Sequence, residues 1–217
     1  MYIYEIVESE QHPAYQKLAV ENGLRQYDFL RSIVEAAAQL GRPFLSQSVL
    51  KALNFQAITC LHTNAGEYRP CEVAVGTHQP PARYRVQALM DDFVNYVNRN
   101  WEQADAVVLA AYVLWRLNYI HPFINGNGRT ARAACYFVIC LKIGVWLPGQ
   151  VILPELISQN RDIYYAALQQ ADESHKAGQV DLQPLIDYLS ALLDQQLSTA
   201  EVLVNPDSES KRPEPQV

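Results

Sequence analysis

The sequence predicts an all-α domain that carries one small β-hairpin, and three observations lead to this fold class. Apolar residues recur at helical spacing over most of the chain, for example within residues 13–40 and 105–119. Hydrophobic residues make up 49% of the 217 residues and charged residues 18%, which predicts a folded chain with one substantial core. Residues 62–83 are instead rich in glycine, proline and turn-forming residues, and Glu72–Val75 before Gly76 is typical of half a short hairpin.

The helices follow one another along the chain, with recognisable start and stop signals near the N-terminus. Residues 1–12 are mixed in character and predict a short strand or an extended arm. Pro13 suits the first position of a long helix, and Gly41 stops it. Either Ser46 or Ser48 can cap the next helix. We expect that second helix to reach about residue 61, and further helices over residues 84–100, 105–119, 128–143 and 181–200. Residues 153–176 predict one or two helices.

The pattern indicates one domain with a short extension at each end. The domain covers residues 13–204, between the N-terminal arm of residues 1–12 and a tail of residues 205–217. The tail is polar and contains prolines, so we expect it to be disordered. The helix over residues 105–119 is apolar on nearly all sides, which predicts a central and buried position.

Charge and composition exclude several classes of function. The formal net charge is −6 and there is no basic run, which argues against nucleic acid or an anionic membrane as a partner. The N-terminus is not typical of a signal peptide, and no stretch of about 18 apolar residues occurs, so we expect a cytoplasmic protein. The cysteines lack metal-ligand spacing and are expected to be reduced and mostly buried: Cys60, Cys71, Cys135 and Cys140. Four histidines are expected to be ordinary surface residues: His12, His62, His78 and His175.

The most informative segment is HPFINGNGRTAR, residues 121–132. Pro122 prevents the preceding helix from continuing normally, and Phe123 gives the loop an apolar anchor. Gly126 and Gly128 allow the backbone to fold tightly and to approach a ligand closely. A new helix starts here, and its free N–H groups and dipole favour an anion.

Three side chains of this segment suit phosphate chemistry. Arg129 and Arg132 are three residues apart, so both project from one face of the helix start, where guanidinium groups suit a polyphosphate. His121, at the end of the facing helix, is then a candidate general base. A glycine-rich turn with solvated arginines and a structural histidine is the alternative, but the combined pattern favours one site.

This segment resembles the motif of the Fic family, HPFx(D/E)GNGRxxR, and matches all of its specified positions but one. Residues 66–69 resemble the G-x-Y-R sequence before the family's flap, which would here be residues 71–81. Residues 162–165, DIYY, resemble a helix that lines the adenine pocket in relatives. The matches span about residues 15–190, so the resemblance implies a Fic-type helical bundle with a small β-hairpin flap.

The resemblance implies a protein adenylyltransferase that uses ATP, with Mg²⁺, to modify a hydroxyl side chain of a target protein and releases pyrophosphate. His121 would deprotonate the target hydroxyl, and Tyr165, with Tyr164, would lie near the base. The anion hole would comprise Gly126, Asn127 and Gly128, with Asn127 on the phosphate, while Arg129 and Arg132 would bind the β- and γ-phosphates. The flap backbone at Val73, Ala74, Val75 and Gly76 would align the target as an added strand.

The departure from the motif is Asn125, which stands where the family has a metal-binding acid. An amide oxygen can bind a hard cation but contributes no negative charge. Mg²⁺ could still bind through Asn125 and the phosphates, a neighbouring carboxylate (Glu67, Glu72 or Asp172) could substitute, or the protein could bind nucleotide and catalyse poorly. The alternative to an adenylyltransferase is therefore a nucleotide-binding regulatory module with little catalysis. Gly128 favours nucleotidyl over γ-phosphoryl transfer, because kinase-like relatives carry lysine there.

Two expectations concern regulation and assembly. Relatives carry an inhibitory helix with Ser/Thr-x-x-x-Glu-Gly/Asn, and Glu21 followed by Asn22 matches half of it, with Lys17 at the hydroxyl position. Glu21 is thus the inhibitory candidate, and a solvated helix face is the alternative that we favour. The resemblance also raises a homodimer as an expectation.

Overall fold

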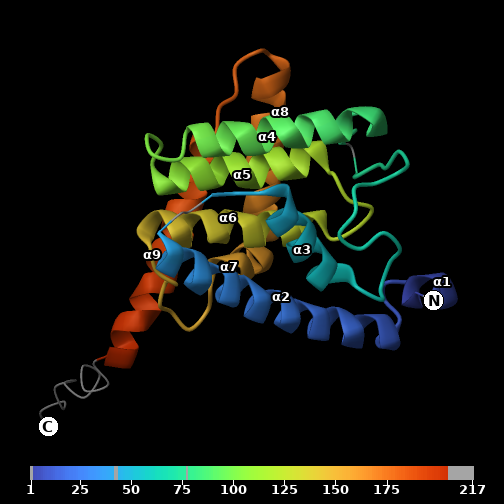
Figure 1. Cartoon of the computed structure of the whole chain (residues 1–217), viewed down its shortest axis with the longest axis horizontal. Helices are drawn as coiled ribbons and strands as arrows, with labels where there is room; N and C mark the ends of the chain where they lie inside the picture. The colour runs from blue at the N-terminus through green and yellow to red at the C-terminus, as the bar shows by residue number, and fades with distance from the viewer. Residues whose placement is uncertain (1, 42–43, 77, 205–217) are drawn as a thin grey trace, which may run out of the picture.

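The computed structural model describes residues 2–41, 44–76 and 78–204, and these residues are mainly helical, as the sequence predicts. The expected tail, residues 205–217, lies outside the described residues. The helices follow the expected order, with a short 3₁₀ turn before α4 (Figure 1). Their bounds are α1 Ile3–Val7, α2 Pro13–Leu40, α3 Gln47–Ile58, η1 Arg83–Arg85, α4 Val86–Arg99, α5 Ala106–Ile120, α6 Asn127–Ile143, α7 Leu153–Gln159, α8 Arg161–Lys176 and α9 Gln183–Val204.

Local capping explains where the first long helices begin and end. Pro13 occupies the first turn of α2, and the backbone N–H of Ala14 donates to the side chain of His12. Gly41 ends α2 in the left-handed conformation, at φ 61°. Ser46, not Ser48, caps α3 by accepting a hydrogen bond from the N–H of Val49. The expected boundaries are therefore confirmed to within a few residues.

The N-terminal arm differs from the expectation, because residues 3–7 form a short helix instead of a strand or an extended arm. The first N–H groups of this helix have partners far along the chain. The N–H of Ile3 donates to the carbonyl of Cys60 at 2.9 Å, and the N–H of Tyr4 donates to that of Leu61 at 3.1 Å. These bonds satisfy the helix start and dock α1 against the loop that follows α3.

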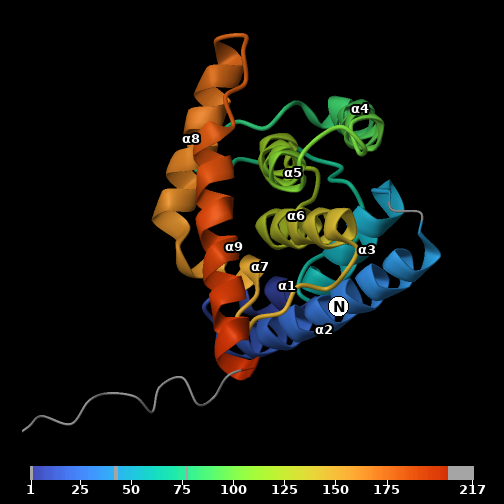
Figure 2. The ribbon, with the colours of Figure 1, turned by 90° about the vertical axis from the view of Figure 1, so that its left-hand side faces the viewer.

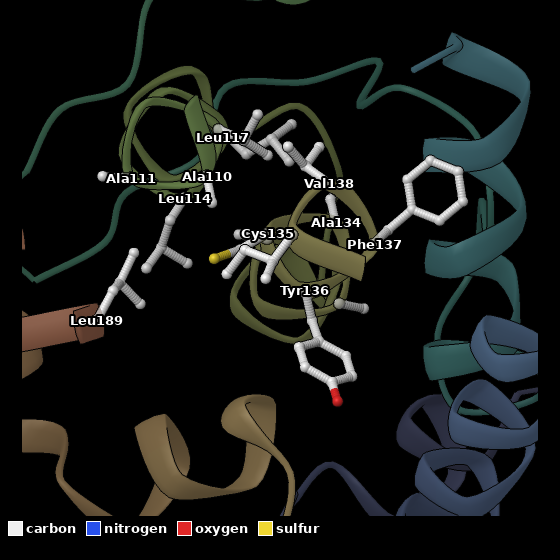
Figure 3. Close-up of a cluster of buried hydrophobic side chains, with 14 of the residues drawn as sticks. Ala110, Ala111, Leu114, Leu117, Ala134, Cys135, Tyr136, Phe137, Val138 and Leu189 are labelled. Atoms are coloured by element: carbon white, nitrogen blue, oxygen red, sulfur yellow. The ribbon is translucent and has the colours of Figure 1, made fainter. Parts of the chain in front are cut away.

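Helix α6 lies at the centre of the bundle and contacts α2, α3, α5 and α7 (Figures 1 and 2). Nearly every residue of α6 beyond its first turn is buried, up to Leu141. Small residues on the two facing helices, such as Ala110 on α5 and Ala134 on α6, let α5 and α6 approach closely (Figure 3). Helix α5 is largely buried, as its all-round apolar sequence predicts, and α6 shares that central position. The start of α6 is thereby fixed by the core.

The expected hairpin is not formed as a pair of strands. Within the described part of residues 62–83, the antiparallel contacts are isolated bridges, between Val75 and His78 and between Tyr68 and Phe123. Prolines lack the N–H that a ladder needs, and Pro70, Pro80 and Pro81 all lie within this segment. We call residues 71–81 the flap, and their fold is an extended loop with one bridge.

Two smaller expectations have mixed outcomes. Cys135 and Cys140 are buried in α6, whereas Cys60 and Cys71 are exposed, so the thiols are not mostly buried. Among the described helices, none is both long and apolar enough to cross a membrane.

Candidate active site

Two residues in the left-handed backbone conformation set the shape of the loop between α5 and α6. His121 caps α5 with φ 51° and ψ 59°, and Gly126 precedes α6 with φ 75°. A Cβ atom at Gly126 would lie 2.6 Å from Cγ2 of Ile58, so any larger residue would push α3 away from the loop. Residue 126 must therefore be glycine for both conformation and space.

Asn127 closes this loop with its side chain. Its Oδ1 accepts from the N–H of Phe123 at 2.9 Å, and its Nδ2 donates to the carbonyl of Phe123 at 2.8 Å. Phe123 is fully buried, and its ring packs against Tyr68. The side chain of Asn127 is thus bound to the loop. Its backbone N–H, at the first turn of α6, is the group placed to meet an anion.

A buried asparagine that sequence reasoning did not select clamps the loop from α3. The Nδ2 of Asn54 donates to the carbonyl of Asn125 at 2.9 Å and to Oγ1 of Thr130 at 3.3 Å. Its Oδ1 accepts from the N–H of Gly66 at 3.0 Å. Asn54 has no exposed surface, so it joins the loop, α6 and the start of the 66–69 segment inside the protein.

The arginine of the 66–69 segment ties the flap to the same loop. Arg69 is 3% exposed, and its Nε donates to the carbonyl of His121 at 2.8 Å. Its other nitrogens donate to the carbonyls of Cys71 and Pro81, at the two ends of the flap. Arg69 therefore fixes the distance between the flap and His121.

The two arginines of α6 occupy different surroundings. Arg129 donates to the carbonyl of Ala57 at 2.6 Å and to Oδ1 of Asn125 at 3.3 Å, so it points toward α3. Arg132 has no hydrogen bond or ion pair to any described residue, and its NH1 would lie 3.3 Å from a Cβ atom at Gly128. Both line a cavity of about 310 Å³ between α2 and α7, which we call the arginine cavity. Arg132 is thus the cation left available above the helix start.

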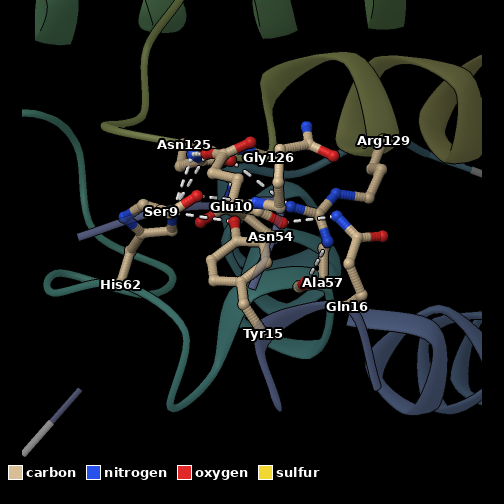
Figure 4. Close-up of polar contacts among 11 residues, drawn as sticks. Ser9, Glu10, Tyr15, Gln16, Asn54, Ala57, His62, Asn125, Gly126 and Arg129 are labelled. Atoms are coloured by element: carbon tan, nitrogen blue, oxygen red, sulfur yellow. Dashed lines mark hydrogen bonds and ion pairs between the residues drawn. The ribbon is translucent and has the colours of Figure 1, made fainter. Parts of the chain in front are cut away.

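Asn125 takes part in a polar cluster with the N-terminal segment (Figure 4). Its Nδ2 lies 2.9 Å from Oε1 of Glu10 and 2.9 Å from Nε2 of His62, whose ring also contacts the hydroxyl of Tyr15 at 2.9 Å. His62 is 8% exposed, so it is not the surface histidine that we expected. Burial lowers the pKa of His62 and raises that of Tyr15 to about 12.

The carboxylate beside Asn125 is Glu10, which sequence reasoning did not propose. The three candidates that it proposed have other partners. Glu67 pairs with Lys51 at 2.8 Å. Glu72 pairs with Arg69 at 3.3 Å, and Asp172 pairs with His78 at 3.2 Å. A separation of 115 residues between Glu10 and Asn125 leaves no local signal in the sequence.

His121 faces a second and larger cavity of about 500 Å³, which we call the histidine cavity. It lies between the flap and α8, and its lining includes Val75, Gly76, His78, Tyr165, Asp172 and Lys176. Burial lowers the pKa of His121 most, and the neighbouring His78 and Arg69 act in the same direction. A hydrogen bond from the ring to the backbone of Asn118 opposes them, and the resulting pKa is about 4. The imidazole is therefore neutral at pH 7, as a proton acceptor must be.

The structure brings part of the expected site together and separates the rest. Tyr165 and the flap tip at Val75 and Gly76 share one cavity with His121, whereas Tyr164 is buried beneath. Glu21 stands apart, because it is exposed on α2 and pairs with Arg25 at 3.4 Å. Near this position, Val20, Gly23 and Leu24 of α2 line the arginine cavity, and a Cβ atom at Gly23 would meet no heavy atom within 4 Å.

Comparison with known proteins finds relatives of part of this chain. The model of the Fic/DOC family matches residues 44–139. A protein adenylyltransferase Fic of Drosophila persimilis is 32% identical over 133 residues, which cover 61% of this chain and 24% of that protein. The protein of the same name from Drosophila grimshawi is 33% identical over 135 residues, which cover 61% of this chain and 25% of that protein. The chain thus spans about a quarter of the length of these relatives.

Solved structures share the fold. The crystal structure of a Fic domain containing signaling protein from Bacteroides thetaiotaomicron superposes with a TM-score of 0.70 at 24% identity, over 95% of this chain and 80% of that one. Fic-1 from C. elegans, residues 134–508, gives a TM-score of 0.69 at 22% identity, over 88% of this chain and 52% of that one. The helical bundle expected from the sequence is therefore confirmed.

Proposed function

We propose that this chain, which is similar to the Fic/DOC family over residues 44–139, transfers AMP from ATP to a hydroxyl side chain of a target protein and releases pyrophosphate. The observation that carries the proposal is the position of His121. Its neutral imidazole faces a cavity of about 500 Å³ that also contains Tyr165 and the flap tip. The curated relatives named protein adenylyltransferase add support from their sequence similarity.

In the proposed reaction, each group of the site has one role. His121 accepts the proton of the target hydroxyl, whose oxygen then attacks the α-phosphorus of ATP. The bond between the α-phosphorus and the bridging oxygen breaks, and pyrophosphate leaves with that oxygen. The N–H groups at the first turn of α6 and the guanidinium of Arg132 hold the phosphates and neutralise their charge. Positioning and charge neutralisation are the main requirements of such a transfer.

The surroundings of Asn125 do not fit Mg²⁺ in the observed arrangement. Its Oδ1 accepts from the N–H of Gly126 at 2.6 Å and from Arg129 at 3.3 Å, so it faces donors that a cation could not replace. Its Nδ2 points at Glu10 and His62. Over the residues that the structure describes, no group of three or more His, Cys, Asp or Glu side chains could hold a metal ion. We therefore assign no step to a cation.

The poor fit of the Asn125 surroundings to Mg²⁺ favours one second function. A loop that binds nucleotide without a cation ligand suits a regulatory module with weak or no catalysis. His121 is the residue that separates the two functions, because a binding module needs no base at the mouth of the cavity. Both functions predict nucleotide binding, and the first alone predicts transfer.

The test is labelling with ATP that carries its label on the α-phosphate or, in parallel, on the γ-phosphate. Wild type, His121→Ala and a matched control, His12→Ala, are incubated with a lysate and Mg²⁺ or Mn²⁺. Protein-bound α-label that disappears with His121→Ala and persists with His12→Ala would support adenylyl transfer. Label from the γ-phosphate alone would refute it in favour of a kinase-like reaction. Neither label, with measurable ATP binding, would favour the regulatory module.

The target is proposed to dock on the flap. Ala74, Val75 and Gly76 are exposed, and the described contacts leave the backbone groups of Val73 and Ala74 unpaired. An extended target segment could add to them as a strand. A cytoplasmic location, a homodimer and the absence of a nucleic-acid partner stay predictions.

A further inference from the structure

His78, on the flap, makes two contacts that together favour a positive charge on its ring. Its Nδ1 lies 3.2 Å from Oδ2 of Asp172 on α8. Its Nε2 lies 3.0 Å from the carbonyl oxygen of Tyr119 at the end of α5. A carboxylate and a carbonyl can only accept hydrogen bonds, and a neutral imidazole can donate from one nitrogen only. Both contacts are hydrogen bonds only if His78 is the doubly protonated imidazolium.

The partner of His78 is itself held in place. Oδ1 of Asp172 accepts a hydrogen bond from Nε1 of Trp115 at 2.9 Å, which orients the carboxylate. The side chains of His78 and Asp172 are 19% and 17% exposed. An ion pair that is shielded to this degree is screened less by salt than one on the open surface. Within the described residues, it is the ion pair that joins the flap to α8.

The charges around His78 favour the protonated ring on balance. Helix α8 places Asp172, Glu173 and Lys176 on the same cavity wall. The hydrogen bond to Asp172 raises the pKa of His78 most, burial and Lys176 oppose it, and the carbonyl of Tyr119 adds to the increase.

His121 lines the same cavity as His78, so the two rings affect each other. A positive charge on the flap disfavours a second positive charge on His121. Arg69, whose guanidinium donates to the carbonyl of His121, acts in the same direction. The flap thus brings the positive charge of His78 close to the ring of His121, which must stay uncharged to accept a proton.

We propose that His78 is a second functional histidine of this site, a positioning residue whose imidazolium binds Asp172, holds the flap against α8 and places a positive charge beside His121. This role rests on the proposed transfer reaction for its use, but the charge state of His78 can be measured without it. His78 also lines the histidine cavity itself. Its pairing with Asp172 therefore links flap position to the state of the base.

The first test is a side-chain NMR titration of the ¹⁵N-labelled histidines, assigned with single His→Asn variants. We expect both ring nitrogens of His78 to be protonated at pH 7, with a titration midpoint above the ordinary value of 6.5. Asp172→Asn keeps the size of the side chain and should lower that midpoint by about one pH unit. Glu173→Gln, a neighbouring carboxylate on the same wall, is the matched control and should leave it unchanged. A neutral His78 at pH 7 in wild type would overturn the proposal.

The second test follows His121 and the transfer reaction. In His78→Asn, His121 should titrate about one pH unit higher than in wild type. The rate of α-label transfer in wild type should decline at alkaline pH as His78 loses its proton, and His78→Asn should lack that decline. Transfer with an identical pH profile in both proteins would refute the inference and leave the proposed function standing. If no transfer is found at all, the proposed function fails, and the two NMR titrations still decide the role of His78.

Discussion

Replacement of the buried Asn54 tests whether the loop before α6 is held from α3. Asn54→Leu keeps the approximate size of the side chain but removes its hydrogen bonds to Asn125, Thr130 and Gly66. A net contribution of about 1 kcal/mol for each bond predicts a loss of about 3 kcal/mol in the free energy of unfolding. The N–H of Gly66 is buried and would keep no partner, which adds to that cost. For a chain of this size the loss corresponds to a decrease of about 6–12 °C in melting temperature.

The assay is thermal unfolding followed by circular dichroism, together with calorimetric titration of ATP. Asn95→Leu is the matched control, because Asn95 is exposed on α4 and its replacement should change stability by less than about 0.5 kcal/mol. We expect Asn54→Leu to bind ATP more weakly than the control at a temperature where both are folded, since the carbonyl of Asn125 is released. A melting temperature within about 2 °C of wild type would show that the clamp does not hold the loop.

Three further changes test other parts of the site. Gly23→Glu would place a carboxylate in the arginine cavity and should weaken ATP binding at least about tenfold in calorimetry. Glu21→Gly should leave ATP affinity and transfer unchanged. Equal effects of the two variants would exclude the arginine cavity as a site for ATP. Asn125→Asp should lower the free energy of unfolding by about 1–2 kcal/mol, because its carboxylate would then face the carboxylate of Glu10. Added Mg²⁺ should restore part of this loss in a melting assay. The pKa of His121 is lowered to about 4 in the folded protein, so the unfolded chain binds the proton first as pH decreases. The free energy of unfolding should therefore fall by about 3 kcal/mol between pH 6.5 and pH 4. A urea titration in which His121→Gln loses as much would refute this.

Local sequence signals predicted the features that depend on neighbouring residues. Pro13, Gly41 and Ser46 set helix ends through backbone geometry and capping, and the structure confirms each of them. The segment from His121 to Arg132 predicted a tight loop before a helix, because glycine and proline restrict the backbone in known ways. The flap was predicted as a short β-hairpin, whereas its described residues form an extended loop with one isolated bridge.

The features that were missed depend on contacts between distant segments. Helix α1 has little helical signal of its own, and its first N–H groups are satisfied by Cys60 and Leu61. Asn54 appeared as one polar residue in a helix, and its role needs the α5–α6 loop and Gly66 beside it. The charge of His78 follows from two acceptors on α5 and α8, which no spacing in the sequence brings together.

The amide at position 125 and the carboxylate of Glu10 are best understood as one feature. An aspartate or glutamate at 125 would place a second negative charge within hydrogen-bond distance of Glu10, whereas Asn125 donates a hydrogen bond to it at 2.9 Å. The amide thus lets the N-terminal segment dock on the loop, where His62 and Tyr15 complete the contact. In this arrangement the negative charge beside the loop comes from residue 10 and not from the motif. Displacement of Glu10 would remove one of the two contacts of the Asn125 Nδ2 group, so a change in the N-terminal segment is transmitted to the loop before α6.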